Sequence, residues 1–156
     1  MHFPIIKIEP IDLPREDWDI DLDYEDKTLL EYTDYYGDLY TEDERRKVIE
    51  SEWLKELLNG IATVDGEKET ITFLDAQTIR NTLAEYFNDE SRKLYELAQT
   101  GECSGYDLRK AGTHFRDFYT LFVDDYGKTS LDFAEDAVYH AGGTYMIGNI
   151  FDAHIR

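Results

Sequence analysis

The sequence predicts an α+β fold, with a small, mainly antiparallel sheet and four to five helices in a single domain over residues 1–156. Two observations lead to this prediction. Short apolar runs typical of strands alternate with longer segments whose apolar residues recur at helical spacing. The chain has 156 residues, of which 42% are hydrophobic and 14% aromatic, so it can bury a sizeable core. Neither an internal repeat nor a low-complexity linker divides it.

The N-terminal region is predicted to be extended. A run of isoleucines indicates a strand from Phe3 to Ile11, and Pro4 and Pro10 confine such a strand to a sheet edge or limit its ends. From Asp17 to Tyr24 acidic and apolar residues alternate strictly, which is the period of a half-buried strand. Aspartate is a poor strand former, so an extended arm is the competing interpretation. In the strand, the residues facing the core would be Trp18, Ile20, Leu22 and Tyr24.

Helical signals and a hairpin follow. Lys27 to Tyr36 could form a short helix that ends at Gly37. Thr41 and Glu44 have the spacing of a capping box, and the helix that they open is expected to run to Leu58 and stop at Asn59-Gly60. Next, Ile61–Val64 and Glu69–Leu74 are expected to pair as a β-hairpin around a short loop that contains glycine.

The C-terminal half is predicted to be mostly helical. Asp75 caps a helical pattern that ends at Thr100-Gly101, as one long helix or two consecutive ones. The remaining predicted elements are an amphipathic helix from Gly105 to Asp124, a shorter helix from Leu131 to His140 that stops at Gly142-Gly143, and a strand from Thr144 to Phe151.

Composition limits the compartment and the partners. A single cysteine, Cys103, excludes an internal disulfide framework and suits a reducing compartment. The N-terminus shows no secretory leader, and no window approaches the roughly 18 apolar residues of a membrane span. We therefore expect a cytoplasmic location. A net charge of −19 disfavours direct binding to nucleic acid or to an anionic membrane.

The charge is concentrated between Glu9 and Glu44, which we call the acidic segment. It contains fifteen acidic residues and two basic ones, Arg15 and Lys27, and so carries a formal −13 of the total −19. Solubility alone would be met by an even distribution, as in residues 102–156, which hold nine acidic and five basic residues. Concentrated charge is instead what complementarity to a basic surface requires.

Motifs for metal binding and catalysis are not found. A calcium loop that starts at Asp19 would need glycine and glutamate where the chain has Tyr24 and Leu30. The histidines are scattered without metal-ligand spacing. Cys103 lies in a loop beside Glu102, which opposes formation of a thiolate. We expect no catalytic residue, no metal and no cofactor.

The candidate site is the tyrosine-rich acidic surface between Asp17 and Glu44. Tyrosine is enriched at interface hot spots, and carboxylates around it can pair with Arg and Lys of a basic partner. The residues expected to bind that partner are Asp17, Asp19, Asp21, Asp23, Glu31, Asp34, Tyr35, Tyr36, Asp38, Tyr40, Glu42 and Asp43.

In composition, the acidic segment resembles the anti-restriction and anti-CRISPR DNA mimics of phages and mobile elements. The resemblance implies an inhibitor that is not an enzyme and that blocks a basic nucleic-acid-binding protein. Three alternatives stay open: an immunity or antitoxin protein against a basic nuclease, a carboxylate-based metal-dependent enzyme, and an accessory protein whose acidic surface serves solubility only.

Overall fold

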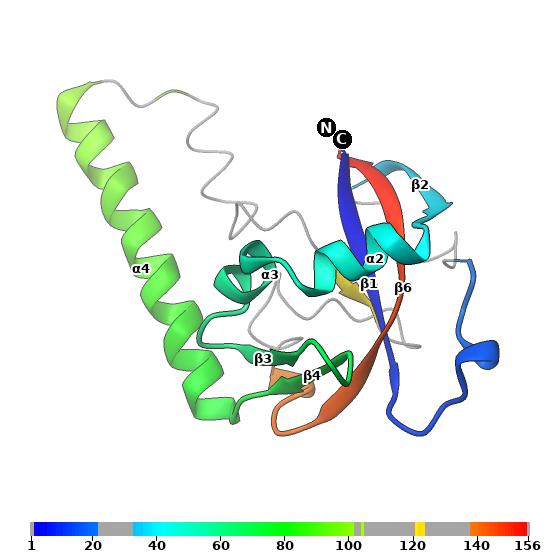
Figure 1. The fold of residues 1–156 in the computed structure, drawn as a ribbon. Helices are drawn as coiled ribbons and strands as arrows, with labels where there is room; N and C mark the ends of the chain where they lie inside the picture. Colours follow the sequence, from blue (N-terminus) through cyan, green and yellow to red (C-terminus); the bar gives the residue numbers. More distant parts are fainter. Residues whose placement is uncertain (1, 22–32, 102–103, 105–120, 124–137, 156) are drawn as a thin grey trace.

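A computed structural model describes residues 2–21, 33–101, 104, 121–123 and 138–155 (Figure 1). These residues form a six-stranded sheet and three α-helices, so the α+β class is confirmed, whereas the predicted four to five helices are not. The elements in chain order are β1 (His2–Pro10), the 3-10 turn η1 (Arg15–Asp17), β2 (Thr33–Leu39), α2 (Glu42–Ile49), α3 (Glu52–Leu57), β3 (Ala62–Asp65), β4 (Thr70–Phe73), α4 (Ala76–Thr100), β5 (Leu121–Val123) and β6 (Thr144–Ile155).

Strand β6 organises the sheet. The strand order is β3-β4-β6-β1-β5, and β2 also pairs with β6. Along one edge β6 pairs with β4 near its start and with β2 near its end, and along the other edge it pairs with β1. Every pairing is antiparallel except that of β1 with β5. In Figure 1, β1 and β6 therefore cross the molecule side by side, with β2 at one end and the β3–β4 hairpin at the other.

The predicted first strand is confirmed, but it is not an edge strand: β1 lies inside the sheet, between β6 and β5. Pro10 ends the strand, whereas Pro4 lies within it, and both are paired with β6. The pairing with β5 covers only Ile5 to Lys7, so Pro4 and Pro10 lie outside the stretch that pairs on that side. A residue without an N–H is tolerated there because no ladder hydrogen bond on that side requires it.

The strand predicted from Asp17 to Tyr24 is wrong for the described residues. Asp17 ends the 3-10 turn η1, and residues 18–21 form no strand. Trp18 is 6% exposed, but Ile20 is 67% exposed, so the alternation does not sort side chains between core and solvent. Residues 18–21, which we call the acidic arm, form bends and no regular element, so the competing interpretation of an extended arm is not confirmed for them either. Residues 22–24 lie outside the described residues.

The short helix predicted from Lys27 to Tyr36 is wrong where it can be compared. Residues 33–39 form strand β2, which pairs with β6, and residues 27–32 lie outside the described residues. The pairing partner is more than a hundred positions away in the sequence. Tertiary pairing therefore overrides a weak local pattern.

The helix predicted to run from the capping box to Leu58 is divided into two. The capping box is confirmed: the Thr41 side chain accepts from the backbone of Glu44, and the Glu44 side chain accepts from that of Thr41. Helix α2 then ends at Ile49, because the Ser51 hydroxyl donates to the carbonyl of Val48 and accepts the N–H of Leu54. Ser51 thus caps a second helix, α3.

The later elements agree with the prediction in part. The β3–β4 hairpin is confirmed, and α4 is one continuous helix capped by Asp75 and closed by Gly101. The helix predicted from Gly105 to Asp124 is wrong near its end, because Leu121–Val123 is strand β5. The rest of that predicted helix, residues 105–120 and 124, lies outside the described residues. Residues 131–137 of the last predicted helix are also outside it. The final strand is confirmed and extends to Ile155.

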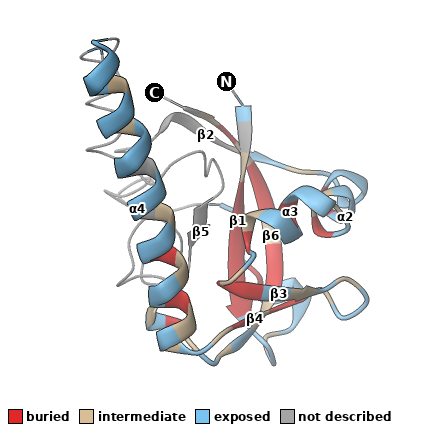
Figure 2. Cartoon of the chain, turned by 90° about the vertical axis from the view of Figure 1, so that its left-hand side faces the viewer, coloured by how far each residue is buried: buried red, intermediate tan, exposed pale blue. Residues whose placement is uncertain are grey.

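The core fills the space between the sheet and the helices. Buried residues of β1, β6 and the β3–β4 hairpin pack against Ile49, Leu54 and Leu58 and against Ile79 and Leu83 of α4. Figure 2 shows this burial at the sheet side of α4 near its start, while the far end of the helix is mostly exposed. Among the described helices, none is long and apolar enough to cross a membrane.

Candidate protein-binding surface

Trp18 anchors the acidic arm to the domain. Its indole N–H donates to the carbonyl of Leu13 at 3.3 Å. The guanidinium carbons of Arg15 and Arg45 each lie 5.2 Å from the centroid of the Trp18 ring, within cation–π range. The arm therefore starts from a fixed point on the surface.

Arg45 meets a bulge in the sheet. The β1–β6 register shifts between Ile6 and Ile8, which leaves carbonyls of β6 outside the regular ladder. Nε of Arg45 donates to the carbonyl of Gly148 at 2.7 Å, and Nη2 donates to that of Ile147 at 2.5 Å. A Cβ atom at Gly148 would lie 3.0 Å from the carbonyl oxygen of Lys7, so the close approach at the bulge favours glycine.

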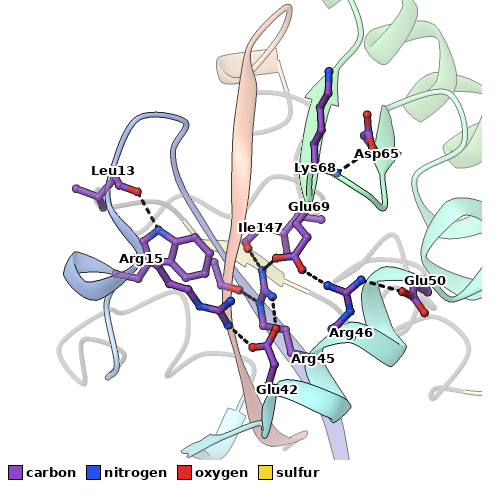
Figure 3. A network of polar contacts seen from close by, with 12 residues as sticks. Leu13, Arg15, Glu42, Arg45, Arg46, Glu50, Asp65, Lys68, Glu69 and Ile147 are labelled. Atoms are coloured by element: carbon purple, nitrogen blue, oxygen red, sulfur yellow. Dashed lines mark hydrogen bonds and ion pairs between the residues drawn. The ribbon is translucent and has the colours of Figure 1, made fainter.

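Carboxylates complete the surroundings of Arg45 (Figure 3). Its Nη2 lies 2.7 Å from Glu69 and its Nη1 lies 3.2 Å from Glu42. Glu69 also pairs with Arg46 at 2.6 Å, and Arg46 reaches Glu50 at 3.1 Å. The arginine network thus links α2 to the start of β4 and to β6.

Glu42, a predicted partner-binding residue, belongs to this network. It pairs with Arg15 as well as with Arg45. Burial raises the pKa of the Glu42 carboxyl, but the hydrogen bonds and charges of Arg15 and Arg45 outweigh burial and hold that pKa below its ordinary value of 4.5. The main contacts of Glu42 are therefore internal.

Asp19, another predicted partner-binding residue, also has internal contacts. Its carboxylate lies 3.1 Å from Nζ of Lys7, whose side chain is 5% exposed. The side-chain amide of Asn149 donates to the backbone carbonyl of Asp19 at 2.9 Å. Asp19 therefore holds the arm against β1 and β6, whereas Asp17 and Asp21 are exposed and form no ion pair with any described residue.

The end of β2 contributes to a hollow of about 600 Å³. Three of its lining residues are acidic and come from three elements: β2, α2 and β6. Asp38 lies directly opposite Asp152 in the β2–β6 register. The complete lining is Asp38, Leu39, Tyr40, Glu44, Lys47 and Asp152.

The pKa of Tyr40 is affected by the charges in this hollow. Its side chain is half-buried, and burial is the main cause that raises the pKa of its hydroxyl above the ordinary value of 10.0. The negative charges of Asp152 and Glu44 raise that pKa further. The phenol therefore stays neutral and can donate a hydrogen bond.

A second, apolar hollow of about 310 Å³ adjoins the first. Tyr40 and Lys47 line both hollows, so the two are neighbours, and we call them together the acidic–apolar groove. The lining of the apolar hollow includes Trp53, the first large apolar side chain of α3, which is 42% exposed. The other residues that line the second hollow are Pro4, Val48 and Ser51.

The predicted site residues are distributed over these features. Asp38 and Tyr40 lie in the groove, and Glu42 and Asp43 lie on α2 beside it. Asp34, Tyr35 and Tyr36 belong to β2, but their side chains are outside the description, as are Asp23 and Glu31 altogether.

Sequence reasoning missed several lining residues of the groove, notably Glu44, Asp152 and Trp53. Asp152 is an acid in an otherwise apolar stretch of strand, which is a usable signal, but it follows the predicted end of that strand at Phe151. Trp53 falls inside the helix predicted to run from the capping box to Leu58, and no local pattern there marks it as exposed.

Within the part of the chain that the structure describes, no group of three or more His, Cys, Asp or Glu residues is arranged to hold a metal ion. The chain matches no protein-family model, and comparisons with curated proteins and with solved structures find no match either.

Proposed function

We propose that this chain is a binding protein, not an enzyme, that inhibits a basic nucleic-acid-binding protein by occupying its binding groove. The observation that carries the proposal is the concentration of charge, with fifteen acidic and two basic residues between Glu9 and Glu44. Like charges held on one folded body repel each other, so the cost of this concentration needs a compensating use.

The fate of the basic residues supports the proposal. Arg15, Arg45 and Arg46 all form ion pairs within the arginine network, and Lys7 is buried against Asp19. Their positive charges therefore hold the arm and α2 in place. The acidic segment also contains acidic side chains that are exposed and form no ion pair with a described residue: Asp12, Glu16, Asp17, Asp21 and Asp43.

Inhibition would work by competition. The Lys and Arg residues of a nucleic-acid groove cannot contact phosphates and these carboxylates at the same time. Complementary charge would speed the encounter, and added salt would weaken it, since exposed charges are screened over about 10 Å at 0.1 M salt. Because residues 18–21 form no strand, the mimicry rests on net charge and not on a regular ladder of carboxylates.

The test is displacement of a fluorescent DNA duplex from basic DNA-binding proteins, including restriction endonucleases and CRISPR effector nucleases, followed by anisotropy. Two double variants remove exposed charge: D17N/D21N on the arm side and D38N/D43N beside the groove. The matched control is E85Q/E96Q, which removes two exposed acids from α4. We expect both site variants to slow association and weaken displacement, and the control to behave like the wild type. Equal effects of all three variants would mean that only net charge matters and would contradict this site.

A further inference from the structure

We infer that the acidic–apolar groove receives a polypeptide segment of the partner in which an arginine lies next to a large apolar side chain. The inference rests on the proposed function and names the chemistry that the partner presents at one place. It uses residues that lie outside the acidic segment, namely Asp152 and Trp53, together with residues inside it.

The acidic half of the groove fits a cationic side chain. Glu44 and Asp152 are held by local contacts: Oε2 of Glu44 accepts the N–H of Thr41 at 2.8 Å, and Oδ2 of Asp152 lies 2.8 Å from Nδ1 of His2. Each carboxylate has a second oxygen that can accept a further hydrogen bond. Asp38 brings a third carboxylate to the same hollow.

The strand register brings two carboxylates to one place. Asp38 lies directly opposite Asp152 in the β2–β6 pairing. A guanidinium beside them could bind two carboxylates with its planar fork, which a lysine ammonium cannot match. A phosphate group would be repelled by these carboxylates, so nucleic acid and anionic lipid are excluded as occupants.

The apolar half fits a large uncharged side chain. Trp53 is 42% exposed, and it lies with Val48 and Pro4 around the second hollow. Tryptophan anchors are frequent among residues that dominate binding energy at protein interfaces. Tyr40 lines both halves, so the arginine and its apolar neighbour would each come near this side chain.

Among the described lining residues, Lys47 is the one whose charge should oppose binding of an arginine. It lines both hollows and forms no ion pair with the described residues, so its ammonium would repel an incoming arginine. Removing this charge should therefore strengthen binding, which is the opposite of the effect expected for the acidic residues. A site that responded only to protein stability would not show this reversal.

The experiment is an NMR titration of the full chain with three short synthetic peptides. The parent peptide contains adjacent arginine and leucine residues; the second has citrulline, an uncharged analogue, in place of arginine; the third has glycine in place of leucine. The signals followed are the backbone amides of Asp38, Glu44 and Asp152 and the indole N–H of Trp53. We expect the parent to bind with millimolar or tighter affinity, and each altered peptide to bind about tenfold more weakly.

Variants of the chain provide the second arm. E44Q/D152N and W53A should each weaken binding of the parent peptide about tenfold, K47Q should strengthen it, and D17N/D21N should leave it unchanged. Glutamine at position 44 can keep the capping box, so E44Q tests charge and not folding. Equal binding of the citrulline peptide, or unmoved Trp53 and Asp152 signals at millimolar parent peptide, would overturn the inference.

The two proposals can fail separately. If the peptides do not bind but the chain still displaces DNA through its arm, the groove inference is wrong and the inhibitor proposal stands. If the parent peptide binds as expected but no basic protein releases its DNA, the inhibitor proposal is wrong and the groove stands as a docking site.

Discussion

Arg45 carries a positive charge into the interior and is surrounded by acceptors. Its side chain is 2% exposed and contacts two backbone carbonyls of β6 and two carboxylates. A buried charged group and its partners can be replaced by apolar residues with little loss of stability only when all of them are changed together. Removal of the arginine alone leaves the buried carbonyls of Ile147 and Gly148 without their donor. Glu69, which is 13% exposed, then keeps only Arg46 as an ion-pair partner among the described residues.

We predict that R45M lowers the free energy of unfolding by about 3–5 kcal/mol, because it breaks a buried charged network on one side only. The control is E50Q, which removes the exposed pair between Glu50 and Arg46 and should change stability by less than about 1 kcal/mol. Urea unfolding at neutral pH measures both. Similar losses for R45M and E50Q would show that the network contributes no more than an ordinary surface pair.

Tyr40 gives a prediction for alkaline pH. Its pKa is raised in the folded state, above 10.0, so the folded state holds the phenolic proton more tightly than the unfolded state does. The associated stability is fully present below about pH 10 and is lost as the pH rises through the folded pKa. The wild type should therefore lose more stability than Y40F between about pH 9 and pH 11, as measured by urea unfolding. Parallel losses in the two proteins would contradict the raised pKa.

The division between α2 and α3 depends on one hydroxyl. Ser51 closes the first helix and opens the second, and this turn places Val48 and Trp53 at the same hollow. We predict that S51A costs about 1 kcal/mol in unfolding free energy, since the α3 N-terminus loses its cap. S91A, at an exposed position inside α4, is the matched control and should be neutral or slightly stabilising, because alanine favours helix interiors. A neutral S51A would mean that packing alone sets the break.

Local patterns predicted the elements whose signals lie within the element itself. The capping box at Thr41, the hairpin turn after Asp65 and the caps of α4 were all visible in short windows of sequence. The alternation after Asp17 misled, because the indole of Trp18 is fixed by two arginines and not by a neighbouring strand. Strand β2 was missed because its partner β6 is distant in sequence.

The candidate site was predictable to the same extent. Asp38 and Tyr40 follow from the concentration of acid and tyrosine in one stretch. Their approach to Asp152 follows from the β2–β6 register, and the apolar end of the groove follows from the position of α3. Neither relation is expressed in a local pattern, so composition indicated the surface but not its shape.

For the molecule as a whole, a charge of −19 dominates the electrostatics. Most of the ion pairs found among the described residues involve exposed side chains, and such pairs contribute little. Repulsion among the remaining acids should therefore outweigh attraction at low ionic strength.

We accordingly predict that the melting temperature rises as sodium chloride is added from about 0.01 M to 0.1 M, where the screening length falls from about 30 Å to 10 Å. D17N/D21N should show a smaller rise, because part of the repulsion is already absent. Thermal melts followed by circular dichroism test both statements. A melting temperature that falls over this range would mean that favourable pairs dominate.

The position of β6 as the common neighbour of β1, β2 and β4 has a consequence for how the chain folds. His2 pairs with His154, so the first strand must wait for the last one before either can complete its hydrogen bonds. Loops of this length close slowly, and folds rich in distant pairings cross their barrier more slowly than local ones do. During synthesis, the edges of β1 and β2 that pair with β6 stay without that partner until β6 leaves the ribosome. The strong negative charge nearby would help the unfinished chains to repel each other during that interval.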